Sequence, residues 1–197
     1  MSSLKERIEL LEAHLTSVPP QIAVYHDLPF AILRYHPTEE WQLRREVRRL
    51  ATRLEGKEVS VIPLSDLLWE ALDRVGAADD AEGLEAVIEL ERSDGFLTAQ
   101  EQVTTYLSDK DWCPLAKLLT ERLSALDPSK GIAFLIRAAA MAPKIYEMSK
   151  LLDQMQGKTR VTTILFYPGS IEGTTGLRFM DLKDRDALGN YRVKIYG

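Results

Sequence analysis

The sequence is poor in cysteine, with Cys113 alone among its 197 residues. A single thiol cannot form an internal disulfide, which is typical of proteins from a reducing compartment. Long apolar runs are also lacking, because the longest, GIAFLIRAAAMAP, is interrupted by Arg137 and is too short to cross a bilayer. The first residues, MSSLKERIELLEAHL, are charged and lack the apolar core of a signal peptide. We therefore expect a cytoplasmic protein without membrane contact.

Motifs for catalysis and metal binding are missing from the sequence as well. The patterns HExxH, CxxC and GxSxG do not occur, and metal-ligand spacing is absent among His14, His26 and His36. Cys113 has an aromatic residue and a proline as neighbours and no histidine near it in the sequence, so we expect a packed, inert thiol. The chain is predicted not to be an enzyme, and to use neither a metal nor a cofactor.

The sequence has fewer basic residues than acidic ones, with 25 lysines and arginines and 30 aspartates and glutamates. The formal net charge is −5 and the isoelectric point is near 5.3, so the molecule as a whole is not attracted to a polyanion. Any contact with nucleic acid would need a local basic patch that acts against this field. The hydrophobic fraction of 45% is ordinary for a globular protein, and the length is enough for one domain with a sizeable core.

Apolar runs alternate with amphipathic segments along the chain. Helices are predicted at 3–15, 38–55 and 142–156, with one more that opens at Ser65 and Asp66. Strands are predicted at 29–35, 59–64, 131–138 and 160–168. Thr38 is the expected N-cap of the second helix. Continuous apolar strands that alternate with helices indicate a mostly parallel sheet with helices on both faces. The fold class is therefore α/β, with three layers.

Near the C-terminus, apolar residues begin to alternate one by one with charged residues. Leu177 and Phe179 alternate with a charged residue, and Val193 and Ile195 do the same further on. This alternation is typical of half-buried strands, and we expect an antiparallel pair joined through residues 181–190. We predict a single domain over residues 1–197, in which 79–126 form a mainly helical insertion.

A glycine-rich stretch, LFYPGSIEGTTGLRF, follows the fourth predicted strand. A phosphate-binding P-loop would need a lysine after its last glycine and a helix behind it. Here Gly176 is followed by Leu177 and a strand-like pattern, and Glu172 adds negative charge to the loop. The spacing therefore favours a structural turn. Ligand binding stays open as an alternative, because the loop leaves the carboxyl end of a central strand.

The predicted helix 38–55 has a basic outer face. Its narrow apolar stripe consists of Leu43, Val47, Leu50 and Leu54. The rest of its circumference carries Arg44, Arg45, Arg48, Arg49 and Arg53. Trp41 points away from the stripe one turn before Arg45, which suggests a cation–π contact. Such a face suits a protein hot spot or a stacked nucleotide, and the simpler alternative is a solvated helix surface.

Acidic residues gather near the C-terminus. Asp181, Asp184 and Asp186, together with Glu172, are a candidate Mg²⁺ site. The basic residues interleaved with them favour a solvated loop instead. We therefore assign no metal to this segment.

Several segments together resemble one family. These segments are PFAILRYHPTEEWQLRREVRRLATRL, VIPLSDLLWEAL, FLIRAAAMAPKIYEMSKLLDQMQGKTRV and LFYPGSIEGTTGLRFMDLKDRDALGNYRVKIYG. They are similar to the BrxB proteins, which are encoded in BREX anti-phage defence loci and carry a domain of unknown function. The last segment is the most specific, because residues 166–169, 176–179 and 190–192 stand in the family's order. The family has no assigned activity, so the resemblance supplies no catalytic residues.

The resemblance implies a set of partners. BREX loci also encode a DNA methyltransferase, a large ATPase and an alkaline-phosphatase-like protein called PglZ. A small subunit without a catalytic constellation is most simply an assembly or adaptor protein of such a complex, with PglZ as the preferred contact. The expected contact residues on the basic helix are Trp41, Arg44, Arg45, Arg48 and Arg49. A second set, for a ligand-binding or docking loop, is Gly169, Glu172, Gly176, Arg178, Asn190, Tyr191 and Arg192.

Two other functions remain open from the sequence. One is nucleic-acid binding through the basic helix together with Arg178, Arg192 and Lys194. The other is a degenerate nucleotide-binding domain with its site beside Gly169.

Overall fold

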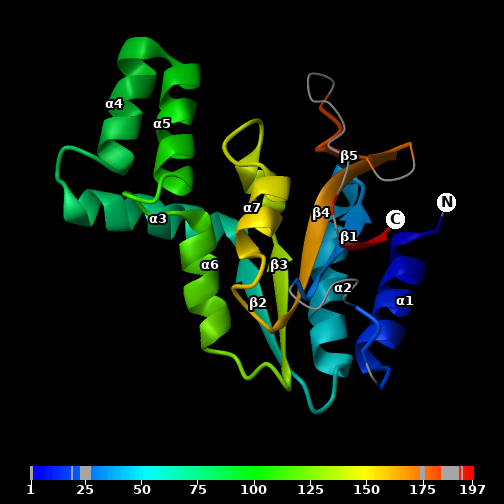
Figure 1. Ribbon diagram of the computed structural model, residues 1–197. Coiled ribbons are helices and arrows are strands. Elements are labelled where there is room, and N and C mark those ends of the chain that lie inside the picture. Colours follow the sequence, from blue (N-terminus) through cyan, green and yellow to red (C-terminus); the bar gives the residue numbers. More distant parts are fainter. Residues whose placement is uncertain (1, 19, 23–27, 174–175, 183–190, 192) are drawn as a thin grey trace.

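The computed structural model describes residues 2–18, 20–22, 28–173, 176–182, 191 and 193–197. A six-stranded sheet forms its centre, with the order β2-β3-β4-β1-β6, and β5 pairs with β4 beside this row (Figure 1). Neighbours within the row are parallel. The strands are β1 (Phe30–Tyr35), β2 (Glu58–Pro63), β3 (Gly131–Ile136), β4 (Thr162–Glu172), β5 (Gly176–Phe179) and β6 (Lys194–Tyr196). The predicted mostly parallel α/β fold is confirmed.

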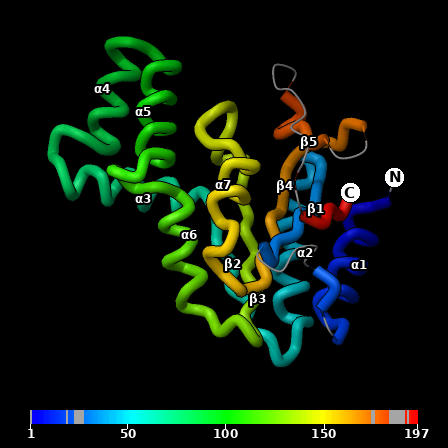
Figure 2. Tube along the Cα trace, in the orientation of Figure 1, coloured from blue at the N-terminus to red at the C-terminus, as the bar shows by residue number. Residues whose placement is uncertain are grey.

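Helices cover both faces of the sheet. They are α1 (Leu4–Thr16), α2 (Glu40–Arg53), α3 (Leu64–Ala78), α4 (Leu84–Asp94), α5 (Phe96–Ser108), α6 (Leu115–Ser124) and α7 (Met148–Met155). Helices α1 and α2 pack on one face, whereas α6 and α7 pack on the other. Helices α4 and α5 lie side by side at one end of α3, away from the sheet (Figure 2). Within the described ranges, no helix is long and apolar enough to cross a membrane.

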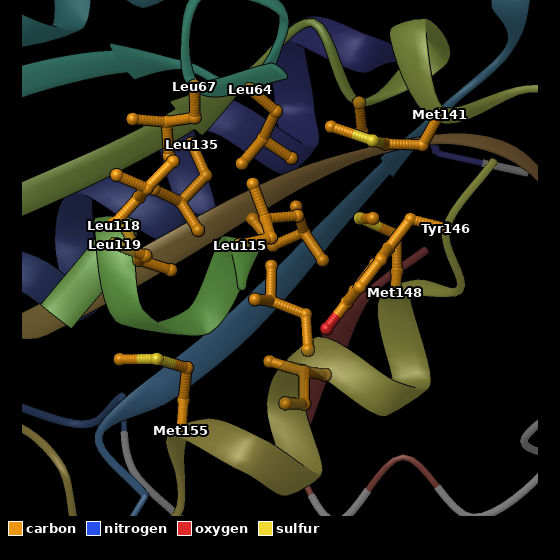
Figure 3. Packing of buried hydrophobic residues seen from close by; sticks show 14 of the residues in the cluster. Leu64, Leu67, Leu115, Leu118, Leu119, Leu135, Met141, Tyr146, Met148 and Met155 are labelled. Carbon is orange, nitrogen blue, oxygen red and sulfur yellow. The ribbon is translucent and has the colours of Figure 1, made fainter. Parts of the chain in front are cut away.

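Alternation along the strands divides the core into two clusters. In β1, Ala31 and Leu33 pack toward α1 and α2, while Phe30 and Ile32 pack on the opposite side. Figure 3 shows this second cluster, in which leucines of α6 and methionines of α7 pack on one face of the sheet with Leu135 of β3. All six residues of β1 are buried, as expected for a strand covered by helices on both faces.

Two helix boundaries differ from the prediction. The second helix begins with a 3₁₀ turn, η1 (Pro37–Glu39), and its cap is His36, whose ring accepts a hydrogen bond from the backbone N–H of Thr38. Thr38 therefore lies inside the turn, not at its cap. The segment 142–156 is not one helix either, because a 3₁₀ turn, η2 (Ala138–Met141), precedes it and α7 begins only at Met148. Between them the chain forms turns, in which the N–H groups of Ile145 and Tyr146 both donate to the carbonyl oxygen of Met141, and Tyr146 is buried in the core.

The C-terminal strands pair differently from the prediction. An antiparallel pair is present, but it joins β5 to the extended end of β4, with Gly176 opposite Glu172. Strand β6 instead lies parallel to β1, at the edge of the sheet. The physical reason is that β4 continues through Glu172, so β5 finds its partner across a short turn. The proposed pairing of 177–179 with 191–196 was wrong.

Candidate partner-binding surface

Helix α2 places a row of arginines on the outside of the molecule. Its apolar residues Leu43, Val47 and Leu50 are buried against the sheet, which turns the opposite side of the helix to solvent. The side chains of Arg45 and Arg49 are 63% and 59% exposed. We call the set of Trp41, Arg44, Arg45, Arg48 and Arg49 the basic face.

Trp41 is more exposed than the other tryptophans of the protein. It is 78% exposed, which is unusual for a large aromatic side chain. The guanidinium carbon of Arg44 lies 4.8 Å from the centre of its ring, within the range of a cation–π contact. The predicted contact with Arg45 was wrong, because Arg44 is the arginine held at the ring. Exposed aromatic and arginine side chains are the typical anchors of protein interfaces.

Two consecutive, partly buried hydrogen bonds fix Arg44 in this position. Arg44 donates from Nε to Oε1 of Glu40 at 2.7 Å, and the other oxygen of Glu40 accepts a hydrogen bond from the hydroxyl of Tyr35. Burial, followed by this bond to the carboxylate, raises the pKa of Tyr35 well above its usual value, so the hydroxyl keeps its proton. These two hydrogen bonds connect Tyr35 in the core strand β1 to Arg44 on the surface. They preorganise the side chain of Arg44 on the basic face.

The basic face carries more positive than negative charge. Glu40 pairs with Arg44, and Glu46 lies 2.8 Å from Nη1 of Arg49 and 3.8 Å from Nε of Arg45. The four arginines of this face are thus paired with only two carboxylates. Arg48 donates to the carbonyl oxygen of Arg44 at 3.3 Å, and it makes no ion pair with any residue in the described ranges. The surplus favours a partner with negative charge.

A pocket of about 320 Å³ adjoins the basic face. It is lined by Glu40, Arg44, Ser65, Arg137, Ala139 and Ala140. These residues come from the segments that follow β1, β2 and β3, so the pocket lies at the carboxyl ends of the strands. Sequence analysis missed Arg137 and Ser65 as site residues. The sequence did carry a signal for both residues, because each lies close to the carboxyl end of an apolar run.

Arg137 is held in a left-handed conformation, with φ 57° and ψ 36°. Its Nη1 lies 3.5 Å from the hydroxyl of Ser65 and 3.7 Å from a carboxylate oxygen of Asp66. Such a backbone conformation is costly for a residue with a side chain and is often found at binding sites. Two arginines, Arg44 and Arg137, therefore line the pocket, each with one carboxylate near it.

The glycine-rich stretch forms part of the sheet. Residues as far as Glu172 belong to β4, and Gly176 opens β5, so the predicted loop is a β-hairpin over most of its length. Gly169 has φ 150°, and a Cβ built on it would lie 2.0 Å from the carbonyl oxygen of Arg178. Its lack of a side chain is thus explained by the close approach of β5. Glu172 forms an ion pair with Arg178 across the hairpin. The preferred prediction, a structural turn between strands, agrees with this geometry.

The remaining candidates of the C-terminal segment are only partly described. Asn190 and Arg192 lie outside the described residues, as do Asp184, Asp186 and His26. Tyr191 packs its ring against Tyr167, with the two centres 6.0 Å apart. Asp181 lies 3.4 Å from Nε2 of His36. No group of three metal-ligating side chains occurs among the residues that the structure describes.

Cys113 is buried, as predicted, with 7% of its surface exposed. Burial raises the pKa of its thiol, which favours the unreactive protonated form.

The fold and this surface define a class of protein: an open, mostly parallel α/β sheet in three layers, with a basic helix face beside the carboxyl ends of its strands. The family model for the BREX protein BrxB matches residues 61–195, which is more than half of the chain. The chain belongs to this family, and the family's setting is the BREX phage-defence system. No curated protein matches the chain.

The matched range begins after α2, which ends at Arg53. Of the four segments that resemble the family, the one at 29–54 lies outside the match. The family match therefore does not cover the basic face.

Proposed function

We propose that this chain is a non-catalytic assembly subunit of a BREX complex, and that the basic face binds another BREX protein, with PglZ as the preferred partner. The observation that carries the proposal is Trp41, exposed on the surface and held by Arg44 and Glu40. A preordered aromatic anchor among charged side chains loses little conformational entropy on binding. The surplus of positive charge adds attraction for an acidic surface.

Binding of nucleic acid is the weaker candidate for the same face. Two of its other three proposed contacts are engaged within the protein: Arg178 pairs with Glu172, and the amine of Lys194 donates to the carbonyl oxygen of Gln21 at 2.9 Å. The third, Arg192, lies outside the described residues. Arg178 and Lys194 therefore do not extend the basic face into a longer track for a phosphate backbone. The net charge of −5 acts against a polyanion as well.

Co-purification with each BREX protein in turn tests the proposal. We expect a stable complex with one of them, and we expect Trp41→Ala combined with Arg45→Ala to weaken it by about tenfold or more. Trp69→Ala combined with Arg92→Ala is the matched control, since it removes another exposed tryptophan and arginine from α3 and α4. Both double variants should keep the melting temperature of the original protein.

Two outcomes contradict the proposal. One is the absence of a complex with every BREX protein. The other is a complex that the Trp41 and Arg45 variant forms with unchanged affinity. A shift of single-stranded DNA that disappears with added salt and with this variant would favour the nucleic-acid alternative.

A further inference from the structure

The pocket beside the basic face is lined by two arginines that use few of their hydrogen-bond donors. Among the described residues, the side chain of Arg44 donates only from Nε, to Glu40. Arg137 lies 3.5 Å from the hydroxyl of Ser65, at the outer limit of a hydrogen bond, and 3.7 Å from a carboxylate oxygen of Asp66. Its Nε is buried without a partner. A guanidinium group carries five N–H donors, so both side chains keep donors that the protein does not use.

The backbone of Arg137 is in the left-handed region, which a side chain disfavours and glycine adopts freely. A glycine here would lose only two long contacts of the side chain. The side chains of Arg137 and Asp66 are 43% and 63% exposed, and exposed pairs of this kind contribute little to stability. Stability of the fold therefore does not explain an arginine at this position. Backbone strain of this kind is often retained for ligand binding.

The first turn of α3 adds backbone donors at the same place. No side chain in the described part of the protein caps this helix, whose N-cap residue is Pro63. The hydroxyl of Ser65 donates to Asp66 at 2.9 Å instead. Since α3 has 15 residues, the unsatisfied N–H groups of its first turn carry the positive end of a long helix dipole. Ser65 lines the pocket, so an anion bound there would also meet these groups.

The carboxylates near the pocket do not fill it. One oxygen of Glu40 accepts from Arg44 and the other from the hydroxyl of Tyr35, so Glu40 is held in place. Asp66 is the more exposed partner of a loose pair with Arg137. A bound anion can therefore replace Asp66 beside Arg137 without breaking a short hydrogen bond to that arginine.

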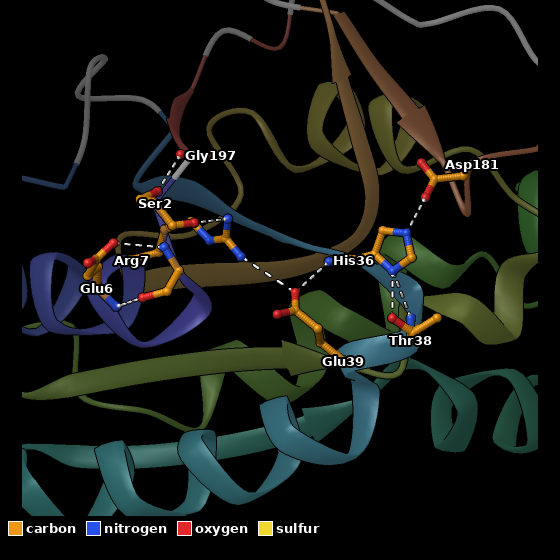
Figure 4. A network of polar contacts seen from close by, with 9 residues as sticks. Ser2, Glu6, Arg7, His36, Thr38, Glu39, Asp181 and Gly197 are labelled. Atoms are coloured by element: carbon orange, nitrogen blue, oxygen red, sulfur yellow. Dashed lines mark hydrogen bonds and ion pairs between the residues drawn. The ribbon is translucent and has the colours of Figure 1, made fainter.

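A neighbouring polar network at the end of β1 is separate from the pocket. In Figure 4, the carboxylate of Glu39 lies 3.6 Å from Arg7 and accepts a hydrogen bond from the backbone N–H of His36 at 3.0 Å. The ring of His36 contacts Thr38 at 2.7 Å and Asp181 at 3.4 Å. None of these residues lines the pocket. The network thus takes no donor from either arginine of the pocket.

We infer that the pocket binds a compact oxyanion, either free phosphate or the phosphate end of a small ligand, between Arg44 and Arg137. Guanidinium forks and the N–H groups of a helix N-terminus match the oxygens of phosphate. The volume of about 320 Å³ is that of a small-ligand site, at the strand ends where open α/β sheets bind ligands. The pocket shares Arg44 with the basic face. The inference does not depend on the assembly role, because binding is measured on the protein alone.

Thermal melting in phosphate and in chloride at equal ionic strength tests the pocket. At ten times its Kd, we expect phosphate to raise the melting temperature of the unaltered protein by about 3–6 °C more than that of Arg137→Gly. This variant removes the guanidinium fork and relieves the backbone strain, so in chloride it should melt at the same temperature or higher. Arg49→Met removes an exposed arginine outside the pocket and should keep the full rise.

Further arms separate the sources of the anion and the effects of folding. Adenosine monophosphate replaces phosphate in one arm. A larger rise than with phosphate, lost in Arg137→Gly, identifies the phosphate end of a nucleotide-sized ligand, and an equal or smaller rise identifies the free ion. Arg137→Asn also tolerates the left-handed backbone and lacks the charge. It should lose the rise as well, and it carries the test if Arg137→Gly does not fold.

Two results would overturn the inference. The first is an unaltered protein that melts at the same temperature in phosphate, adenosine monophosphate and chloride. The second is a rise in Arg137→Gly or Arg137→Asn as large as in the unaltered protein, because the general stabilising effect of phosphate does not need Arg137.

Discussion

At the scale of single residues, side chains that point outward were easier to predict than their partners. The exposure of Trp41 followed from its position opposite the apolar stripe of α2. Its contact with Arg44 did not, because Arg44 is held by Glu40, which in turn depends on Tyr35 in the neighbouring strand. Helical spacing carries no information about that tertiary contact. Arg137 had a visible signal, a charge inside an apolar run, but its left-handed backbone and its place in the pocket required the structure.

Gly169 gives a prediction at this scale. Gly169→Ala should lower the stability of folding by about 2–3 kcal/mol, because the new methyl group meets the carbonyl oxygen of Arg178 and φ is unfavourable. Gly173→Ala is the matched control, since its φ is also positive but its added Cβ meets nothing within 4 Å. It should cost about 1 kcal/mol. Urea denaturation measures both changes, and equal losses would show that the close approach of β5 does not matter.

At the scale of elements, strands were predicted better than their pairing. Apolar runs located β1 to β4 within a few residues. The signal was strongest for β1 and β3, which are buried at every position because helices cover both of their faces. Alternation near the C-terminus correctly indicated further strands. It shows which side of a strand is buried, but not which strand lies beside it, so the placement of β6 next to β1 was missed. The predicted helix 142–156 was too long, because residues 142–145 form turns and α7 begins only at Met148.

Glu40 allows a test of how β1 and the start of α2 are joined. Glu40→Ala should destabilise the protein by about 1–3 kcal/mol, since the buried hydroxyl of Tyr35 loses its acceptor. It should also release Arg44 from the ring of Trp41 and change the fluorescence of that tryptophan. Glu46→Ala removes a carboxylate from the surface pairs of the same helix and should cost at most about 1 kcal/mol. Similar losses in the two variants would contradict the role given to Glu40.

At the scale of the whole molecule, the three-layer arrangement could be derived from the order of strands and helices. The family match covers residues 61–195 and sets the chain in the BREX system. The proposed contact surface lies on α2, before that range, so the case for it depends on geometry: an anchored tryptophan, a surplus of arginines and an adjoining pocket. Neither composition nor net charge could locate this surface, because the molecule is acidic overall.

Oxidative footprinting of the tryptophans tests the assembly role most directly. The protein is oxidised by hydroxyl radicals, alone and in the complex purified from cells that carry the whole BREX locus. The account predicts that oxidation of Trp41 falls several-fold in the complex, while that of Trp69, exposed on α3, does not change. Unchanged oxidation of Trp41 within an intact complex would contradict it.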